Sequence, residues 1–135
     1  MKISDFDTVT PAEKGSFMQV ETVEGEETEA RIKLAGYDST IFRKSRHFHH
    51  SRMAEEKKTG VLGYGDAEEV LLKSIAESTL AWEGIDEDCT PENAEKLYRM
   101  APAVFAQANA HMKDRSNYLG KSSSSSANSQ SKDSS

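Results

Sequence analysis

The stretch from Asp66 to Gly120 holds much of the regularly spaced apolar content of this chain and constrains its fold most strongly. It turns at Gly84 and restarts at Thr90-Pro91, where a typical helix N-cap precedes the residue that best suits the first helical position. Both halves carry apolar residues at three-and-four spacing, which is typical of helices that bury one face. The stretch therefore predicts a small helical unit with one buried side.

The first half of this stretch predicts one helix from Asp66 to Gly84. Asp66 and Glu69 have the spacing of a capping box, and a glycine such as Gly84 is a typical helix stop. The residues expected to be buried along this helix are Leu72, Ile75, Thr79 and Trp82, with Leu71 alongside.

The second half predicts two further helices. One begins with Thr90 as its N-cap and continues through Leu97 and Tyr98. Pro102 is expected to break or restart it, because proline pushes the preceding residue out of helical geometry. The last helix is expected to carry its apolar stripe on Val104, Phe105, Ala108, Met112 and Leu119, with Tyr118 at the edge.

The upstream residues alternate in the manner of β-strands. Residues 16–23 and 28–34 flank a turn that contains Gly25, and Ile32 and Leu34 fall on the same face of the second run. This pattern predicts a β-hairpin. A two-stranded hairpin is marginal in water, so we expect it to pack on the helices.

A basic helix is predicted from Thr40 to about Lys58, with Asp38 or Ser39 as its cap. The glycine-rich segment 59–65 that follows it is typical of a flexible loop. Together these elements predict an α+β fold in which an N-terminal β-hairpin packs on a bundle of about four helices.

Composition favours one domain over residues 1–120. Residues 121–135 are almost all Ser, Asn, Gln, Lys and Asp, and we expect them to form a disordered polar tail. The net charge of -6 favours solubility and disfavours non-specific binding to nucleic acid. The single cysteine and the lack of a signal-peptide pattern or a membrane-length apolar run predict a soluble cytoplasmic protein.

No group of residues has the pattern of a reaction centre. His47 and His50 could share a helix face, but two imidazoles fall short of the ligand set of a zinc site. The acidic run 83–88 lacks the spacing of a calcium loop, and the acidic neighbours of Cys89 disfavour a thiolate. We therefore expect no catalytic residues, no cofactor and no metal, in a protein that is not an enzyme.

Several short motifs follow the hairpin in a characteristic order. They are GYDSTIFR at 36–43, LAWEGI at 80–85, ENAEKLY at 92–98, Pro102 and DRSNYL at 114–119. This order resembles the tail assembly chaperones of long-tailed, lambdoid-type bacteriophages over roughly residues 16–120. The basic stretch from Arg43 to Lys58 departs from the pattern of that family.

The resemblance implies a protein that is absent from the mature virion. It would keep the long, helical tape-measure protein soluble in the host bacterial cytoplasm while tail-tube subunits polymerise around it. In that family a programmed ribosomal frameshift near the end of the gene often yields a minor, extended form. Gly120-Lys121 stands at a suitable place, because the predicted domain ends there.

The residues expected to contact a partner lie mainly on the apolar stripe between Leu72 and Leu119. They are Phe42, Arg43, Leu72, Ile75, Trp82, Tyr98, Phe105, Met112 and Tyr118. The aromatic members either fill the core or line a groove for a client helix, since aromatic residues dominate both settings.

The charge distribution along the chain leaves other partners open. Residues 31–58 hold eight Lys and Arg against three acids, and residues 66–96 hold ten acids against two lysines. These blocks can stay solvated, pair within the fold, or pair between copies in a homo-oligomer. The alternative function is that of a small regulatory nucleic-acid-binding protein that uses the basic helix 40–58.

Overall fold

The computed structural model describes residues 1–120, which form a three-stranded antiparallel sheet in the order β1-β2-β3 and five α-helices. The strands are β1 (Ser16–Glu21), β2 (Glu27–Leu34) and β3 (Thr79–Glu83). The helices are α1 (Val9–Lys14), α2 (Thr40–Glu56), α3 (Tyr64–Glu77), α4 (Pro91–Met100) and α5 (Pro102–Lys113), with 3-10 turns at Ile3–Phe6 and Arg115–Asn117. The predicted α+β class is confirmed, and the tail predicted for residues 121–135 lies outside the described residues.

The predicted hairpin is formed by β1 and β2, and β2 is the central strand of the sheet. Ile32 and Leu34 are fully buried on the face that meets the helices. On the opposite face the guanidinium carbon of Arg31 lies 4.3 Å from the centroid of the Phe17 ring. This alternation is typical of an antiparallel sheet that is covered on one face.

The helix predicted from Asp66 to Gly84 is wrong at both ends. Helix α3 begins at Tyr64, so Asp66 lies in its first turn, and its carboxylate accepts a hydrogen bond from the Gly63 amide at 3.0 Å. The carboxylate of Glu69 does not reach back to this cap but pairs with Arg99 on α4. Helix α3 ends at Glu77, and the following residues pair with β2 as the third strand.

Hydroxyl side chains explain why α3 ends before the predicted stop. Ser78 Oγ donates to the Ser74 carbonyl at 2.8 Å, and Thr79 Oγ1 bonds to the Ile75 carbonyl at 2.9 Å. These carbonyls belong to the last helical turn, where both also accept from the Ser78 amide and no further helical amide follows. The Thr79 hydroxyl also lies 2.8 Å from the buried Tyr98 hydroxyl, which fixes the start of β3 against α4.

The last helix is predicted too long, because α5 ends at Lys113 and Asp114 caps the separate 3-10 turn by accepting a hydrogen bond from the Ser116 amide at 3.0 Å. Tyr118 and Leu119 therefore lie beyond the helix.

Three predicted helix starts agree closely with the structure. Ser39 caps α2 by accepting a hydrogen bond from the Phe42 amide at 3.2 Å. Thr90 caps α4 by accepting one from the Asn93 amide at 3.0 Å. A new helix, α5, begins at Pro102, as proline at the first helical position predicts.

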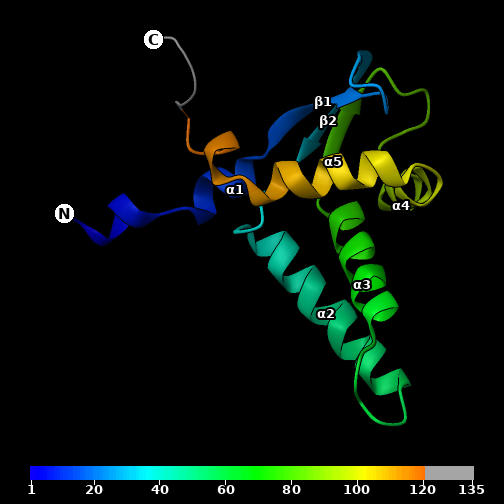
Figure 1. The fold of residues 1–135 in the computed structure, drawn as a ribbon. Coiled ribbons are helices and arrows are strands. Elements are labelled where there is room, and N and C mark those ends of the chain that lie inside the picture. The colour runs from blue at the N-terminus through cyan, green and yellow to red at the C-terminus, as the bar shows by residue number, and fades with distance from the viewer. Residues whose placement is uncertain (121–135) are drawn as a thin grey trace.

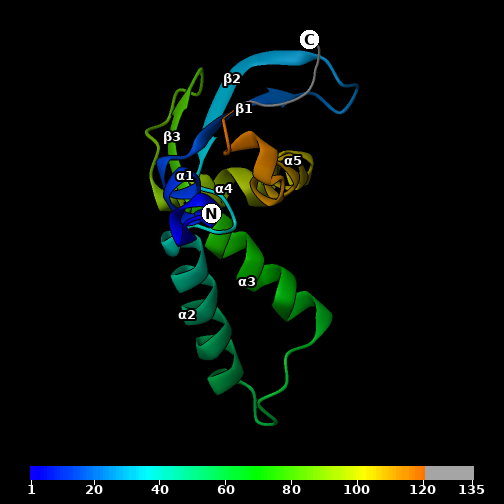
Figure 2. The same ribbon diagram turned by 90° about the vertical axis from the view of Figure 1, so that its left-hand side faces the viewer.

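One contiguous core joins the sheet to helices α2 to α5. Its buried members are Met18, Val20, Ile32, Leu34, Phe42, Leu72, Ile75, Ala76, Ala94, Tyr98, Ala108 and Met112. Figures 1 and 2 show α2 and α3 projecting together from one end of the sheet as a two-helix arm, while α5 lies along the sheet.

The outer edge of β1 is covered by α5. The side-chain amide of Gln107 accepts a hydrogen bond from the Glu21 N–H at 2.9 Å and donates one to the Glu21 carbonyl at 2.8 Å. At the other end of the strand, the His111 ring lies 3.1 Å from the Ser16 hydroxyl, and burial lowers the pKa of His111. These contacts protect a strand edge that is otherwise free to pair with another chain.

Candidate functional site

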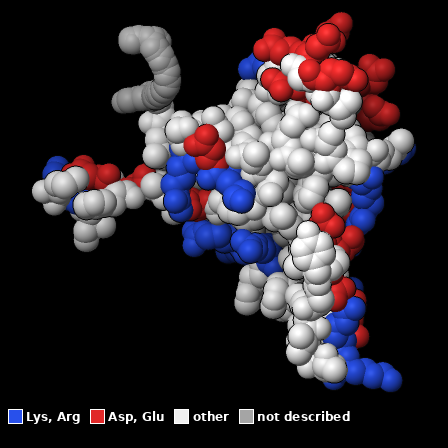
Figure 3. Space-filling view, viewed as in Figure 1, with Lys and Arg blue, Asp and Glu red and all other residues white. Residues whose placement is uncertain are grey.

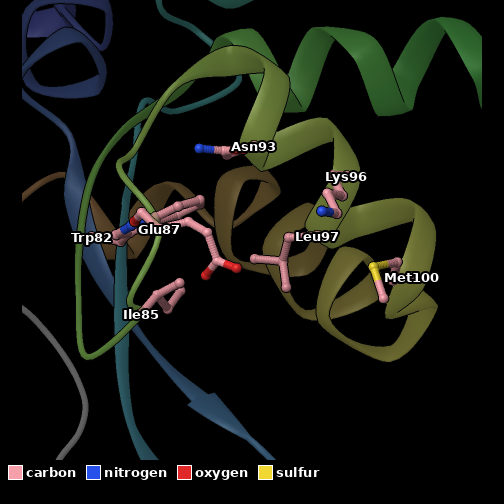
Figure 4. A pocket seen from close by; sticks show the side chains of 7 residues that line it. All are labelled: Trp82, Ile85, Glu87, Asn93, Lys96, Leu97 and Met100. Atoms are coloured by element: carbon pink, nitrogen blue, oxygen red, sulfur yellow. The ribbon is translucent and has the colours of Figure 1, made fainter.

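An apolar groove lies between the end of β3, the connector 84–90 and α4. We call it the Trp82 groove; its lining residues, shown in Figure 4, are Trp82, Ile85, Glu87, Asn93, Lys96, Leu97 and Met100. Its volume is about 170 Å³, and its walls are mainly apolar. Small-molecule sites usually measure roughly 300–1,000 Å³, so this groove suits one large apolar side chain of a partner better than a complete ligand.

Two hydrogen bonds hold the acidic connector, one from β3 and one from α4. The indole Nε1 of Trp82 donates to the Glu87 carbonyl at 2.7 Å. The Asn93 side chain donates to the Asp88 carbonyl at 2.8 Å. Strand β3 places Trp82 opposite Ile32 in β2, so the indole has one side on the core and the other on the groove. The groove is thus preformed, which lowers the cost of ordering it around a partner.

One face of α4 forms the second wall of the groove. Asn93, Lys96, Leu97 and Met100 follow one another at three-and-four spacing and therefore share a helix face. Leu97 packs partly into the core, whereas Met100 is 75% exposed at the end of the helix. A flexible, polarisable methionine beside an apolar pocket can adapt to different side chains.

Most of the predicted contact residues belong to the core instead. Phe42, Leu72, Ile75, Tyr98 and Met112 are all buried, so in this fold their side chains are not available to a partner. The expected stripe between Leu72 and Leu119 is therefore not one continuous surface.

The remaining four candidates reach the surface at separate places. Trp82 lines the groove, Phe105 packs beside Tyr98, and the Tyr118 hydroxyl donates to the Ala35 carbonyl at 3.3 Å. Arg43 is exposed on α2. Of the nine predicted contact residues, the structure thus brings only Trp82 into the groove.

The sequence prediction missed Ile85, Leu97 and Met100 as members of a site. Its assignment of Trp82 to a helix separated that residue from its true neighbours on α4. A usable signal was present, because Thr79 and Trp82 are residue types that favour a strand.

A second hollow lies where α2 meets the last 3-10 turn. We call it the arginine cleft; it measures about 430 Å³ and is lined by Tyr37, Asp38, Phe42, Arg43, Arg46, His47, His50 and Arg115. Arg115 forms a two-point ion pair with Asp38, with N–O distances of 2.6 and 2.9 Å. These bonds hold the pKa of the Asp38 carboxyl below its ordinary value.

The two charge blocks of the sequence are partly paired within the fold. Lys57 pairs with Asp66 at 3.1 Å, and the His49 ring lies 3.1 Å from the Glu77 carboxylate, so polar contacts join α2 to α3. The exposed acids of the hairpin turn and of the connector remain at the far end of the sheet, because β3 runs beside β2 towards that turn. Figure 3 shows acidic side chains gathered at this end and basic ones around the start of α2.

Two further observations concern metals and membranes. In residues 1–120 no group of three or more His, Cys, Asp or Glu side chains is placed to hold a metal ion. Burial raises the pKa of the Cys89 thiol, which lowers the fraction of reactive thiolate. No helix in the described part of the chain has both the length and the apolar character of a membrane span.

The fold and its surfaces define a small α+β domain with an apolar groove and a separate cationic cleft. No protein-family model matches the chain, and searches of curated proteins and of solved structures also find no match.

Proposed function

We propose that the protein is a tail assembly chaperone of a long-tailed bacteriophage, which binds the tape-measure protein in the host cytoplasm and catalyses no reaction. The Trp82 groove is the observation that carries this proposal. Its walls come from two of the motifs on which the family resemblance is based, LAWEGI at 80–85 and ENAEKLY at 92–98. The two motifs are neighbours in the sequence, and the fold places their side chains on facing walls of the groove.

The groove suits an amphipathic client helix that inserts one apolar side chain at a time. A pocket of about 170 Å³ provides one anchor, so each contact is weak and reversible. Several copies along a long tape-measure helix gain strength through multivalency. Arriving tail-tube subunits can then displace the chaperone one contact at a time. The acidic connector beside the groove keeps the complex soluble.

Co-expression tests this function directly. A helical tape-measure fragment that is insoluble alone is expected to become soluble and to co-purify with the protein. The chain has a single tryptophan, so a shift in its emission on binding reports occupancy of the groove. A fragment that stays insoluble, with unchanged Trp82 emission, would contradict the proposal. A gel shift of duplex DNA at low salt would instead favour the nucleic-acid-binding alternative.

We also propose that copies associate along the client, with the basic segment Arg43–Lys58 of one copy facing acids of its neighbour. Asp66 lies beside Lys57 and Glu77 beside His49, whereas the connector acids Asp86, Glu87 and Asp88 are exposed and available to a neighbour. Raising salt from 0.1 M to 1 M shortens the screening length from about 10 Å to about 3 Å. The sedimentation coefficient is therefore expected to fall; an unchanged value would count against this contact.

A further inference from the structure

We propose that the arginine cleft is a binding site for a compact oxyanion, a phosphate or carboxylate group that carries more than one negative charge. This site is separate from the Trp82 groove, because the two hollows have no lining residue in common.

The cleft has cationic side chains without anionic partners. Three arginines and one aspartate line it, which leaves an excess of two positive charges before His47 or His50 is protonated. The aspartate is already occupied by Arg115. None of the ion pairs found in residues 1–120 involves Arg43 or Arg46. Guanidinium groups held close together repel one another, and a bound anion relieves that repulsion.

Two of the three guanidinium groups are held in place without a ligand. Arg115 is fixed by its two bonds to Asp38, and Arg43 donates through Nε to the Asp38 carbonyl at 3.2 Å. The guanidinium of Arg46 lies 6.0 Å from the centroid of the Phe42 ring, which stacks on Tyr37 at 4.4 Å. The terminal nitrogens of Arg43 stay available, and guanidinium matches an oxyanion with paired hydrogen bonds.

The geometry favours a compact anion over a nucleic acid. The cations converge on one hollow from two elements, α2 and the last turn, instead of forming a track. The volume of about 430 Å³ falls in the range of small-ligand sites. Further along the chain, Arg52 pairs with Glu56 and Lys57 pairs with Asp66, so most of the cations beyond the cleft already have anionic partners. A nucleic acid needs several phosphate contacts along its backbone.

Calorimetric titration of the full chain with pyrophosphate and with citrate tests this site. Each titration is matched in ionic strength with sodium chloride, at a protein concentration where sedimentation shows a monomer. We expect saturable binding at one site by at least one of the two ligands. Binding of pyrophosphate but not citrate would identify the natural ligand group as a phosphate. Binding of citrate but not pyrophosphate would identify it as a carboxylate.

Two substitutions on α2 make the test specific. Arg46→Gln is expected to raise the dissociation constant about tenfold or more, because it removes charge-assisted hydrogen bonds. Arg52→Gln, on the same helix but outside the cleft, is expected to leave it unchanged. Thermal unfolding checks that both variants fold, as exposed positions allow.

Three results would overturn the proposal. One is the absence of binding beyond the matched chloride control. Another is an equal loss of affinity in both variants, which would indicate general charge attraction. The third is binding of single-stranded DNA that depends equally on Arg46 and Arg52, which would assign α2 to a nucleic acid.

Discussion

Replacing Gly84 by alanine is expected to lower the free energy of unfolding by about 3 kcal/mol or more. Gly84 has a φ of +77°, and a Cβ there would lie 2.4 Å from the carbonyl oxygen of Glu29 in β2. The left-handed backbone alone costs an alanine roughly 1–2 kcal/mol. The overlap adds roughly 1–3 kcal/mol, because β2 is the central strand and its backbone cannot move freely.

Gly25 provides the matched control for this substitution. Its φ is +86°, but nothing lies within 4 Å of the position that a Cβ would take. Gly25→Ala is therefore expected to cost only the backbone term of about 1–2 kcal/mol. Urea unfolding of both variants separates the two effects. Equal losses would contradict the close packing of the connector against β2, on which the position of the Trp82 groove depends.

Replacing Met100 by lysine is expected to weaken binding of a client helix about 30-fold, the loss of a contact worth about 2 kcal/mol. Met100 is 75% exposed at the rim of the groove, so the substitution removes apolar contact area without opening the core. A lysine also suits the C-terminal end of α4, where the helix dipole favours a positive charge. Stability is therefore expected to stay within about 0.5 kcal/mol of the wild type.

Val23→Lys is the control for the Met100 variant. Val23 is 81% exposed in the turn between β1 and β2 and does not line the groove. This substitution also replaces an exposed apolar residue by lysine, but it does so outside the groove. The affinity for the client is therefore expected to stay unchanged. Titration of a client peptide against the emission of Trp82 measures both variants. Equal affinities for the two variants would place the client elsewhere on the surface.

Local signals in the sequence were enough to predict much of the fold. The alternation around Gly25 predicted the hairpin, and the caps Ser39 and Thr90 predicted the starts of α2 and α4. These features depend on residues a few positions apart, so neighbouring chain segments do not change them. The restart at Pro102 is of the same kind.

The third strand depends on a tertiary contact, because its strand-favouring residues Thr79 and Trp82 also fit the helical spacing of the residues before them. Leu72, Ile75, Thr79 and Trp82 have helical spacing, yet α3 ends at Glu77. The helix gives way because residues 79–83 complete the open edge of β2, a gain that local propensity does not register. Because Trp82 was assigned to this helix, the residues predicted to surround it in the candidate site were also wrong.

Both surface hollows arise where distant segments meet. Trp82 was predicted as a contact residue, but its neighbour Met100 joins it only because β3 and α4 pack together. Asp38 and Arg115 are 77 residues apart, so no sequence spacing connects them in the arginine cleft. Helical spacing also cannot separate a buried apolar side chain such as Tyr98 or Ile75 from an exposed one, which is why five of the nine predicted contact residues belong to the core.

The Gln107 amide has a consequence for how another chain can approach the sheet. It occupies the hydrogen-bonding groups of Glu21 at the outer edge of the sheet, so an incoming polypeptide cannot add itself there as a fourth strand. Contacts of another chain with this position therefore depend on side chains and not on main-chain hydrogen bonds. The sheet of one molecule therefore cannot be extended into a second molecule at Glu21.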